Sequence, residues 1–439
     1  MKWNKILLIN FLLVGFSSFA QEILSVDKAV KIALSNNYGI HIAKNNLQKA
    51  ENNNHIYNKG LLPNLSANSS TSRNNASSKS TNSQGIESEN SNAITKSYSA
   101  GVQLSYTLFD GFQRWYSNLN LKESLALSKL DARQIIENTL LQVYSTYYTA
   151  SLLSENVNNQ LKILEVSKNR FERALIKENY GQVTQLDVLN AEVDINNDSI
   201  RLLELENQLL NVKRDLNVLL GRPVAIEFTT ESQVNFKQDL KKSKLLEYAL
   251  NENVTLLRGQ KQLAIGENIK SLNKGYWLPK LNFNSSYNWS LQDSNNEQLF
   301  ILKQRTTGFN TGLSLSWNIF DGGRSIIQNQ NSAIDILNAE TTLEQIKQEL
   351  TRDVHNAWAS YQNALYLLEV QAKNVETNQN NFKRTEEKFK LGQINSITFR
   401  QAQVNLLNAH TNYNKAVFDA KISELQLLQL SGKMDLVSL

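Results

Sequence analysis

The most constraining feature of this chain is a long internal repeat. Phe109-Asp110-Gly111 recurs as Phe320-Asp321-Gly322, an offset of 211 (320 − 109), and Gly181-Gln182 recurs as Gly392-Gln393 at the same offset. A period of this length is far beyond the 20–50 residues of a solenoid repeat. The sequence therefore predicts two tandem copies of one large structural unit.

The N-terminal segment has the features of a secretory signal. Lys2 and Lys5 precede an apolar run from Ile6 to Phe16, and small residues stand at the −3 and −1 positions before Gln21. We expect a signal peptide at 1–20 and a mature chain that begins near Gln21. The chain has no Cys, which excludes a disulfide framework.

Each copy is expected to open with a helix, over about 26–59 and 244–274. A Leu-Pro pair then ends that helix, at Pro63 and Pro279, because Pro restricts the residue before it. Alternating apolar and polar residues follow, which is typical of strands with one apolar face. We predict strands at about 64–73 and 96–108 in the first copy, and at about 280–291 and 309–320 in the second. The Ser/Asn-rich stretch 73–95 is predicted to be a mobile loop.

A half-buried sheet of a soluble sandwich would also alternate in this way. Two features favour a membrane sheet instead. The polar face is Asn, Ser, Gly and Thr with few charges, and aromatic residues gather near the strand ends, as in outer-membrane barrels. Four strands cannot close a barrel, and open strand edges are not tolerated in lipid. The membrane interpretation therefore requires oligomerisation, and three chains would supply twelve strands.

After Phe-Asp-Gly each copy is predicted to form a long helical hairpin, over 112–221 and 323–432. Apolar residues keep 4-3 spacing from Ile136 to Leu175, which indicates a sustained coiled-coil seam. A turn is expected at each hairpin glycine, Gly181 and Gly392. Residues 222–243 are predicted to join the copies, and 433–439 to form a short tail. The fold class predicted is thus mixed, mostly α, with a duplicated unit and four β-strands per chain.

These motifs, in this order and duplicated, resemble the TolC family of outer-membrane efflux and secretion channels. The resemblance is carried by Leu24–Ala29, the two Phe-Asp-Gly turns, and the two hairpin segments 180–189 and 391–397. It implies a homotrimer with a twelve-stranded barrel in outer-membrane lipid and a helical tunnel in the periplasm. It also implies a passive duct with no cofactor, a periplasmic adaptor protein, and an inner-membrane transporter of the RND, ABC or MFS type.

The resemblance places adaptor docking at the hairpin tips. The tip residues here are Tyr180, Gly181, Gln182, Leu391, Gly392 and Gln393. It also implies a periplasmic gate, in which related channels carry acidic rings six and nine residues after the second hairpin glycine. This chain has Thr398 and Gln401 there, so we expect the constriction to be built differently. Asp187 matches a gating aspartate, but its usual basic partner is replaced by Ile394.

Alternatives remain open for the charged residues near the tips. Asp187 follows Thr184 as in a capping box, which would stabilise the helix end without a role in gating. Arg400 is expected either to project into the lumen or to face solvent. Asp194 and Asp198, four residues apart, are predicted to lie on a solvated helix face.

Two other functions are compatible with parts of the sequence. A trimeric coiled-coil adhesin or structural envelope protein would explain the heptads, but not strand pairs at matching points of two copies. An enzyme is disfavoured, because His41, His55, His355 and His410 lie far apart and no catalytic motif is present. The charge of +5 is spread along the chain, which argues against nucleic-acid binding.

Overall fold

The computed structural model describes residues 22–237, 239–296 and 299–434, and the chain divides into two compact units. Unit 1 contains the described residues up to Asn45, Leu130–Leu257, and those from Glu344 onward. Unit 2 contains Asn46–Lys129 and Arg258–Leu343. Each unit thus draws on both sequence copies. The predicted signal peptide lies outside the described residues.

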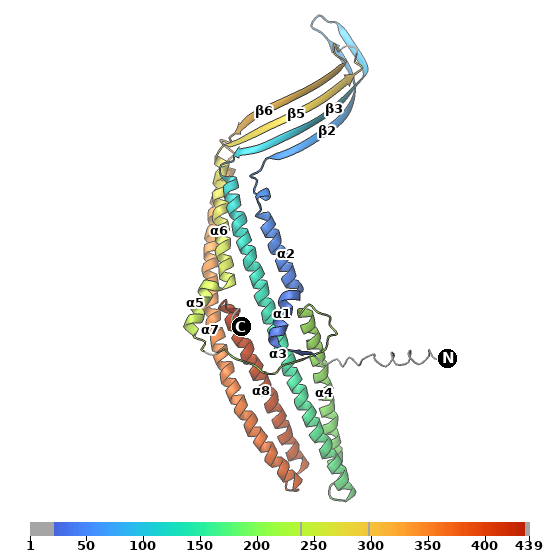
Figure 1. Ribbon diagram of the computed structural model, residues 1–439, viewed down its shortest axis with the longest axis vertical. Helices are drawn as coiled ribbons and strands as arrows, with labels where there is room; N and C mark the ends of the chain where they lie inside the picture. Colours follow the sequence, from blue (N-terminus) through green and yellow to red (C-terminus); the bar gives the residue numbers. More distant parts are fainter. Residues whose placement is uncertain (1–21, 238, 297–298, 435–439) are drawn as a thin grey trace, which may run out of the picture. The chain divides into compact units, whose positions relative to one another are not determined.

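The long helical hairpins recur at the offset seen in the sequence (Figure 1). Helices α3 (Gln113–Asn179) and α7 (Arg324–Lys390) each have 67 residues, and α4 (Gln185–Leu219) and α8 (Ser396–Leu430) each have 35. At 1.5 Å per residue, α3 and α7 are each about 100 Å long.

The opening helix of each copy is two helices, not one. The first copy has α1 (Val26–Asn36), α2 (Tyr38–Asn53) and a short 3₁₀ turn η1 (Ile56–Asn58). The second has α5 (Lys242–Glu252), α6 (Val254–Lys274) and η2 (Gly275–Trp277). The prediction of one continuous helix was therefore wrong in both copies.

An asparagine causes each break. Asn37 has an extended backbone, and its Oδ1 accepts a hydrogen bond from the Ile40 N–H at 3.0 Å, so it starts a new helix as an N-cap. Its Nδ2 donates to the Leu219 carbonyl at 2.7 Å. Asn253 repeats the arrangement by donating to the Leu430 carbonyl at 2.9 Å. Each break therefore satisfies a carbonyl at the C-terminal end of a returning helix.

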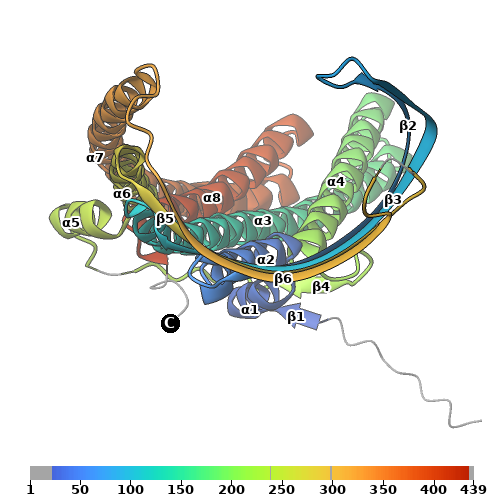
Figure 2. The same cartoon turned by 90° about the horizontal axis from the view of Figure 1, so that it is seen from above.

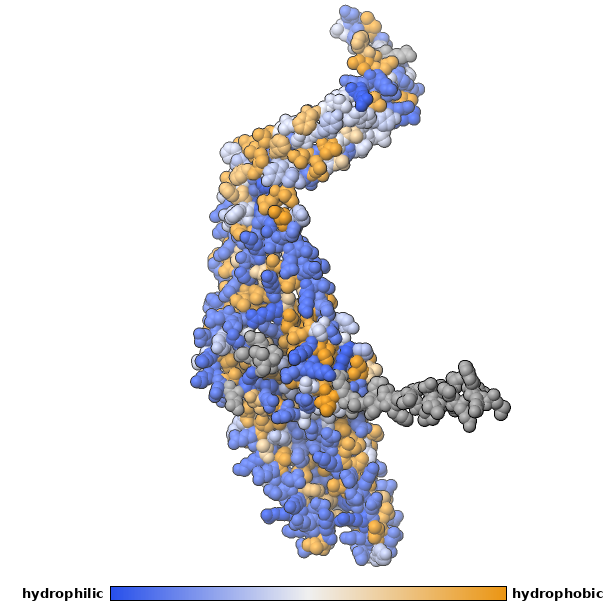
Figure 3. Space-filling view, viewed as in Figure 1, coloured by the Kyte–Doolittle hydropathy of each residue, from blue (hydrophilic) through white to orange (hydrophobic). Residues whose placement is uncertain are grey.

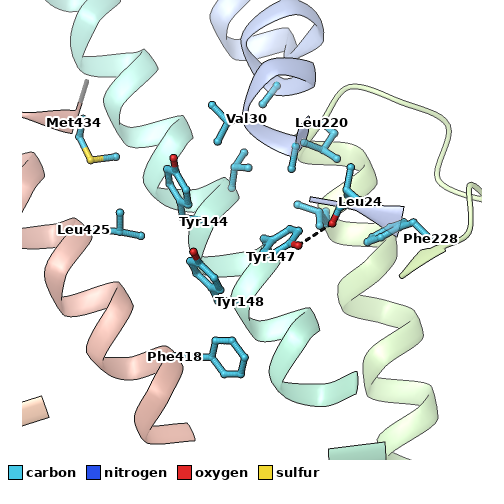
Figure 4. Close-up of a cluster of buried hydrophobic side chains, with 14 residues drawn as sticks. Leu24, Val30, Tyr144, Tyr147, Tyr148, Leu220, Phe228, Phe418, Leu425 and Met434 are labelled. Atoms are coloured by element: carbon cyan, nitrogen blue, oxygen red, sulfur yellow. Dashed lines mark hydrogen bonds between the residues drawn. The ribbon is translucent and has the colours of Figure 1, made fainter. Parts of the chain in front are cut away.

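A tyrosine-rich core lies in unit 1 among α1, α3, α4 and α8 (Figure 4). The Tyr147 hydroxyl donates to the Leu24 carbonyl at 2.7 Å and accepts from the Glu231 N–H at 3.0 Å. Burial raises the pKa of Tyr147 to about 12. This hydroxyl ties two short strands, β1 (Glu22–Leu24) and β4 (Phe228–Thr230), to α3.

The strands β1 and β4 form a parallel pair that the sequence analysis did not predict. Residues 222–243 were expected to be only a joint, but Phe228 is fully buried in the core beside Leu24. Further along the hairpin, α3 and α4 pack through Val157, Leu164, Leu202 and Leu205. Leu161, assigned to the same seam, is 45% exposed in the chain. At 3.6 residues per turn, Leu161 lies to one side of Val157 and Leu164, at the edge of the contact with α4.

Unit 2 contains an antiparallel four-stranded sheet of order β2-β3-β5-β6, which bends into an arc (Figure 2). Its strands are β2 (Asn64–Thr81), β3 (Glu87–Phe109), β5 (Lys280–Ser294) and β6 (Lys303–Ser316). Among the described residues β2 and β6 each pair with one strand only, so both outer edges of the sheet are open. No helix of the described chain is long and apolar enough to cross a membrane.

The strands differ from their predicted limits. The stretch predicted as a mobile loop is a paired extension of β2 and β3, from Asn74 opposite Thr95 to Thr81 opposite Glu87. Backbone pairing does not require apolar side chains, and alternation therefore underestimated its length. The predicted end of the fourth strand, 317–320, lies outside β6, where Trp317 Nε1 donates to the Trp277 carbonyl at 3.0 Å.

The register brings the apolar residues of neighbouring strands to one face. Leu65 lies opposite Leu104, Val102 opposite Tyr287, and Tyr287 opposite Phe309. Hydrophobic side chains gather where the sheet meets the helices of unit 2 (Figure 3). The sheet therefore has one apolar face, as the alternation predicts.

Candidate functional site at the hairpin ends

The two hairpin turns lie at the same end of unit 1 (Figure 1). In each, a glycine with positive φ follows the long helix, +69° at Gly181 and +73° at Gly392. The Gln182 N–H donates to the Lys177 carbonyl at 2.8 Å, and the Gln393 N–H to the Lys388 carbonyl at 2.9 Å. These are Schellman stops, which favour glycine because it has no Cβ to clash in this conformation.

Each tip exposes two large apolar side chains. Tyr180 and Leu186 are 78% and 64% exposed at the first tip, and Leu391 and Ile397 are 73% and 71% exposed at the second. Each tip therefore presents apolar side chains to water at the end of its hairpin. The six predicted tip residues are all exposed.

The predicted gate residues are placed within their own hairpins. Asp187 Oδ2 accepts hydrogen bonds from the Thr184 N–H at 3.0 Å and from the Thr184 hydroxyl at 2.8 Å. These bonds cap the N-terminus of α4. Thr398 occupies the matching position of α8, where its N–H and hydroxyl both donate to Asn395 Oδ1. Ile394 is half-buried, and Gln401 donates to Asn405 at 2.9 Å. Among the described residues, no hydrogen bond joins Asp187 to Ile394, Thr398 or Gln401.

Arg400 belongs to a buried cluster instead. Its guanidinium makes two bonds of 2.7 Å to the carboxylate oxygens of Asp198, and its Nε lies 3.4 Å from Asp194 Oδ1. Paired bonds of this kind between a guanidinium and a carboxylate are among the strongest in proteins. The Arg400 side chain is therefore held by Asp198 and is only 19% exposed, so it does not extend freely into solvent. Its projection into the lumen stays a prediction.

The remaining members complete a network that joins α3, α4 and α8. Ser167 donates to Asp198 at 2.6 Å, Gln403 donates to Ser167 at 3.0 Å, and Arg170 is ion-paired with Asp194. We call these residues the Arg400 network: Ser167, Arg170, Asp194, Asp198, Arg400 and Gln403. Two arginines balance two aspartates, so the network carries no net charge.

Burial of this network overturns the prediction of a solvated face. Asp198 is 4% exposed, Arg170 3%, and Ser167 and Gln403 0%. Burial opposes the charge on Arg400, but the hydrogen bond from Asp198 and the charges of Asp198 and Asp194 raise its pKa. The hydrogen bonds and ion pairs of this cluster therefore hold α3, α4 and α8 together.

The repeat itself carried a signal for this network. At the offset of 211, Asp198 corresponds to Ala409, which is 2% exposed, and Arg400 corresponds to Leu189. A charged residue aligned with a buried alanine is expected to need a buried partner. The unlike pair Asp198 and Ala409 is visible in the sequence, but the burial of this position and the partner Arg400 are visible only in the structure.

Comparisons with known proteins agree with this architecture. The family model described as outer membrane efflux protein matches residues 29–222 and 245–433. The outer membrane protein TolC of Vibrio cholerae serotype O1 is 24% identical over 350 residues, which cover 76% of this chain and 77% of that protein.

Two solved structures show the same fold. The CmeC outer membrane channel of Campylobacter jejuni superposes with a TM-score of 0.77 at 16% identity, covering 93% of this chain and 86% of that one. The MtrE outer membrane channel of Neisseria gonorrhoeae, described in its open state, superposes with a TM-score of 0.72 at 16% identity. The superposition covers 93% of this chain and 89% of that one. The chain therefore belongs to the outer membrane efflux protein family, and is located in the outer membrane with its helical part in the periplasm.

Proposed function

We propose that this protein is the outer-membrane channel of a multi-component efflux or type I secretion system. It acts as a passive duct across the outer membrane and periplasm. An adaptor opens its periplasmic end, and an inner-membrane transporter of the RND, ABC or MFS type supplies the energy. No catalytic step is assigned to the chain.

The four-stranded sheet is the observation that carries this proposal. It has one apolar face, and β2 and β6 leave two open edges. Unpaired backbone groups are costly in hydrocarbon, so the edges must pair with other chains in the outer membrane. A homotrimer closes twelve strands in this way, with β2 of one protomer beside β6 of the next.

The tips support the adaptor contact. They expose Tyr180, Leu186, Leu391 and Ile397, which are apolar residues without a partner in the described chain. A protein that covers these side chains removes apolar surface from water and favours the docked state. Docking is expected to open the channel by small shifts of packed helices.

For the gate, we propose that Asp187, Ile394, Thr398 and Gln401 line the narrow periplasmic end. Arg400 contributes differently, because its guanidinium is held by Asp198 and Asp194 within the protomer. Its proposed part in opening is to keep α8 attached to α3 and α4 as the tips move.

Disulfide locking tests the gate. The natural chain has no Cys, so Asp187→Cys together with Ile394→Cys introduces the only two thiols. Oxidation is expected to link neighbouring tip helices and to stop efflux of a fluorescent substrate, and a reductant should restore it. Each single variant serves as the control, because it cannot form this pair within one protomer. Undiminished efflux from cells in which the disulfide has formed would refute a gate at this place.

The adhesin alternative is not favoured by the family match. Surface labelling separates it from the channel. A cysteine at Asn82, in the turn of the extended β2–β3 hairpin, should react from outside the cell, and one at Gly181 should not. Labelling of both positions from outside would contradict the channel.

A further inference from the structure

The turn between sheet and helix differs between the two copies at one position. Gly111 and Phe112 have φ of +69° and +65°, and the corresponding Gly322 and Gly323 have +73° and +89°. Phe112 thus occupies a left-handed position that the second copy gives to glycine. Such a backbone is strained for a bulky residue, and strain of this kind is retained where the side chain has a use.

The strain holds an aromatic ring outward. Phe112 is 57% exposed and meets the Phe109 ring edge-on, with centroids 5.3 Å apart. Trp115, one turn further along α3, is 64% exposed. These rings line a mainly apolar cavity of about 400 Å³ that also contains Leu61 and Leu108.

The cavity continues the apolar face of the sheet. A bulge between Thr107 and Phe109 shifts the register, so Phe109 lies opposite Leu281 and joins the apolar side. The Arg114 guanidinium lies over the ring of Tyr106, 6.0 Å from its centroid. Because that face meets lipid in the outer membrane, the cavity lies where acyl chains give way to headgroups.

The rim of the cavity is basic. Lys59, Arg114 and Lys122 line it, against one carboxylate, Asp110. Asp110 is bound to Arg114 Nε at 2.8 Å, so its charge is already matched. Within the described chain, no carboxylate lies within ion-pair distance of Lys59 or Lys122. An apolar cavity with two unmatched cations fits a molecule with an acyl chain and a phosphate.

We infer that this junction binds one glycerophospholipid of the inner leaflet of the outer membrane. The acyl chain lies along Phe112 and Trp115, and the phosphate contacts Lys59 and Lys122, with the Arg114 guanidinium behind them. The inference goes beyond the proposed function and does not depend on export activity. It requires only that the sheet lies in the membrane.

Native mass spectrometry of the assembled protein in a nonionic detergent tests the site. Phosphatidylglycerol is the probe, and diacylglycerol, which lacks the phosphate, is the comparison. We expect the natural protein to bind one phosphatidylglycerol per chain. The Lys59→Gln/Lys122→Gln variant should bind it roughly tenfold or more weakly. Phe112→Gly relieves the backbone strain but removes the aromatic ring, so it should weaken the binding of both phosphatidylglycerol and diacylglycerol.

A matched control is Lys373→Gln/Lys383→Gln, which removes two exposed lysines from α7 in the periplasmic part. It should bind phosphatidylglycerol as the natural protein does. Equal affinity of all variants, or equal binding of diacylglycerol and phosphatidylglycerol, would overturn the inference.

Trp115 supplies a second readout. The fluorescence of Trp115 is the difference in emission between the natural protein and the Trp115→Phe variant. This fluorescence should be weaker in vesicles of brominated phosphatidylglycerol than in unbrominated vesicles, because bromine quenches a nearby tryptophan. An unquenched Trp115 in the assembled protein would mean that a neighbouring copy covers the cavity, and would also overturn the inference.

Discussion

At the scale of single residues, two features have energetic consequences: the Arg400 network and the left-handed Phe112. Removing one member of a buried ion pair leaves an uncompensated charge and costs about 3–5 kcal/mol. An exposed pair contributes at most about 1 kcal/mol. The chain contains both kinds on α8, which allows a direct comparison.

Arg400→Gln is expected to lower the free energy of unfolding by about 3 kcal/mol, because Asp198 stays buried without its cation. Urea unfolding followed by circular dichroism measures this change. Lys415→Gln, which breaks the exposed pair with Asp419, is the control and should cost under about 1 kcal/mol. If Arg400→Gln costs no more than Lys415→Gln, the network is not a structural element.

Phe112→Gly should raise the stability of the detergent-solubilised protein by about 1 kcal/mol, because glycine adopts this backbone without strain. The converse change, Gly323→Phe, should lower it by a similar amount. Thermal melting of both variants measures the effect. A lower melting temperature for Phe112→Gly would show that contacts of the ring outweigh the strain.

At the scale of elements, the sequence predicted what depends on local pattern. The lengths of α3 and α7 followed from heptads and hairpin glycines, and the strand faces followed from alternation. The breaks at Asn37 and Asn253 were missed because no Pro marks either of them, and only the first has a nearby glycine, Gly39. An asparagine N-cap was the available signal, but its meaning depends on the distant carbonyls of Leu219 and Leu430.

The extended β2–β3 hairpin shows the opposite error. Its Ser/Asn-rich composition indicated disorder, whereas the backbone of each strand is paired by the other. The turn is fixed by Asn82, whose Oδ1 accepts from the Gln84 and Ile86 N–H groups at 3.0 Å. Amino-acid composition indicates whether side chains can be buried. This hairpin is held by backbone hydrogen bonds instead, so its composition did not reveal its structure.

The contact between α8 and α3 should respond to pH through His410. Burial and the nearby charge of Lys162 lower the pKa of His410 below its usual 6.5. The unfolded chain then binds a proton more readily than the folded one, so stability is complete above pH 6.5 and falls as pH decreases toward the folded pKa. The urea concentration at the unfolding midpoint should therefore decrease when the pH is lowered from 7.5 to 5.5. The decrease should be smaller in the His410→Gln variant. An equal fall in both proteins would exclude His410 as the cause.

At the scale of the whole molecule, the count of four strands predicts oligomerisation, because four strands cannot close a barrel. The composition of the periplasmic site was not predictable in the same way. Tip residues follow from the turn motif, but the Arg400 network depends on contacts between residues about 200 positions apart, such as Asp198 and Arg400. Single-sequence patterns do not contain such contacts.

The open edges of β2 and β6 lead to a test of assembly. The purified mature chain should be trimeric in detergent, by light scattering with correction for bound detergent, because only neighbouring protomers can pair those edges. Removal of detergent should cause aggregation. A folded monomer that stays in solution without detergent would contradict the membrane sheet.

The Arg400 network also bears on stoichiometry. Its charged residues are not repeated: at the offset of 211, Asp198 of the first copy corresponds to Ala409, and Arg400 of the second copy corresponds to Leu189. The two tips of each chain are thus chemically different despite their shared backbone. A partner that recognises only the turn would bind at two places per chain, six per trimer. A partner that discriminates between the halves would bind at three, and the ratio in a purified complex distinguishes these two modes of recognition.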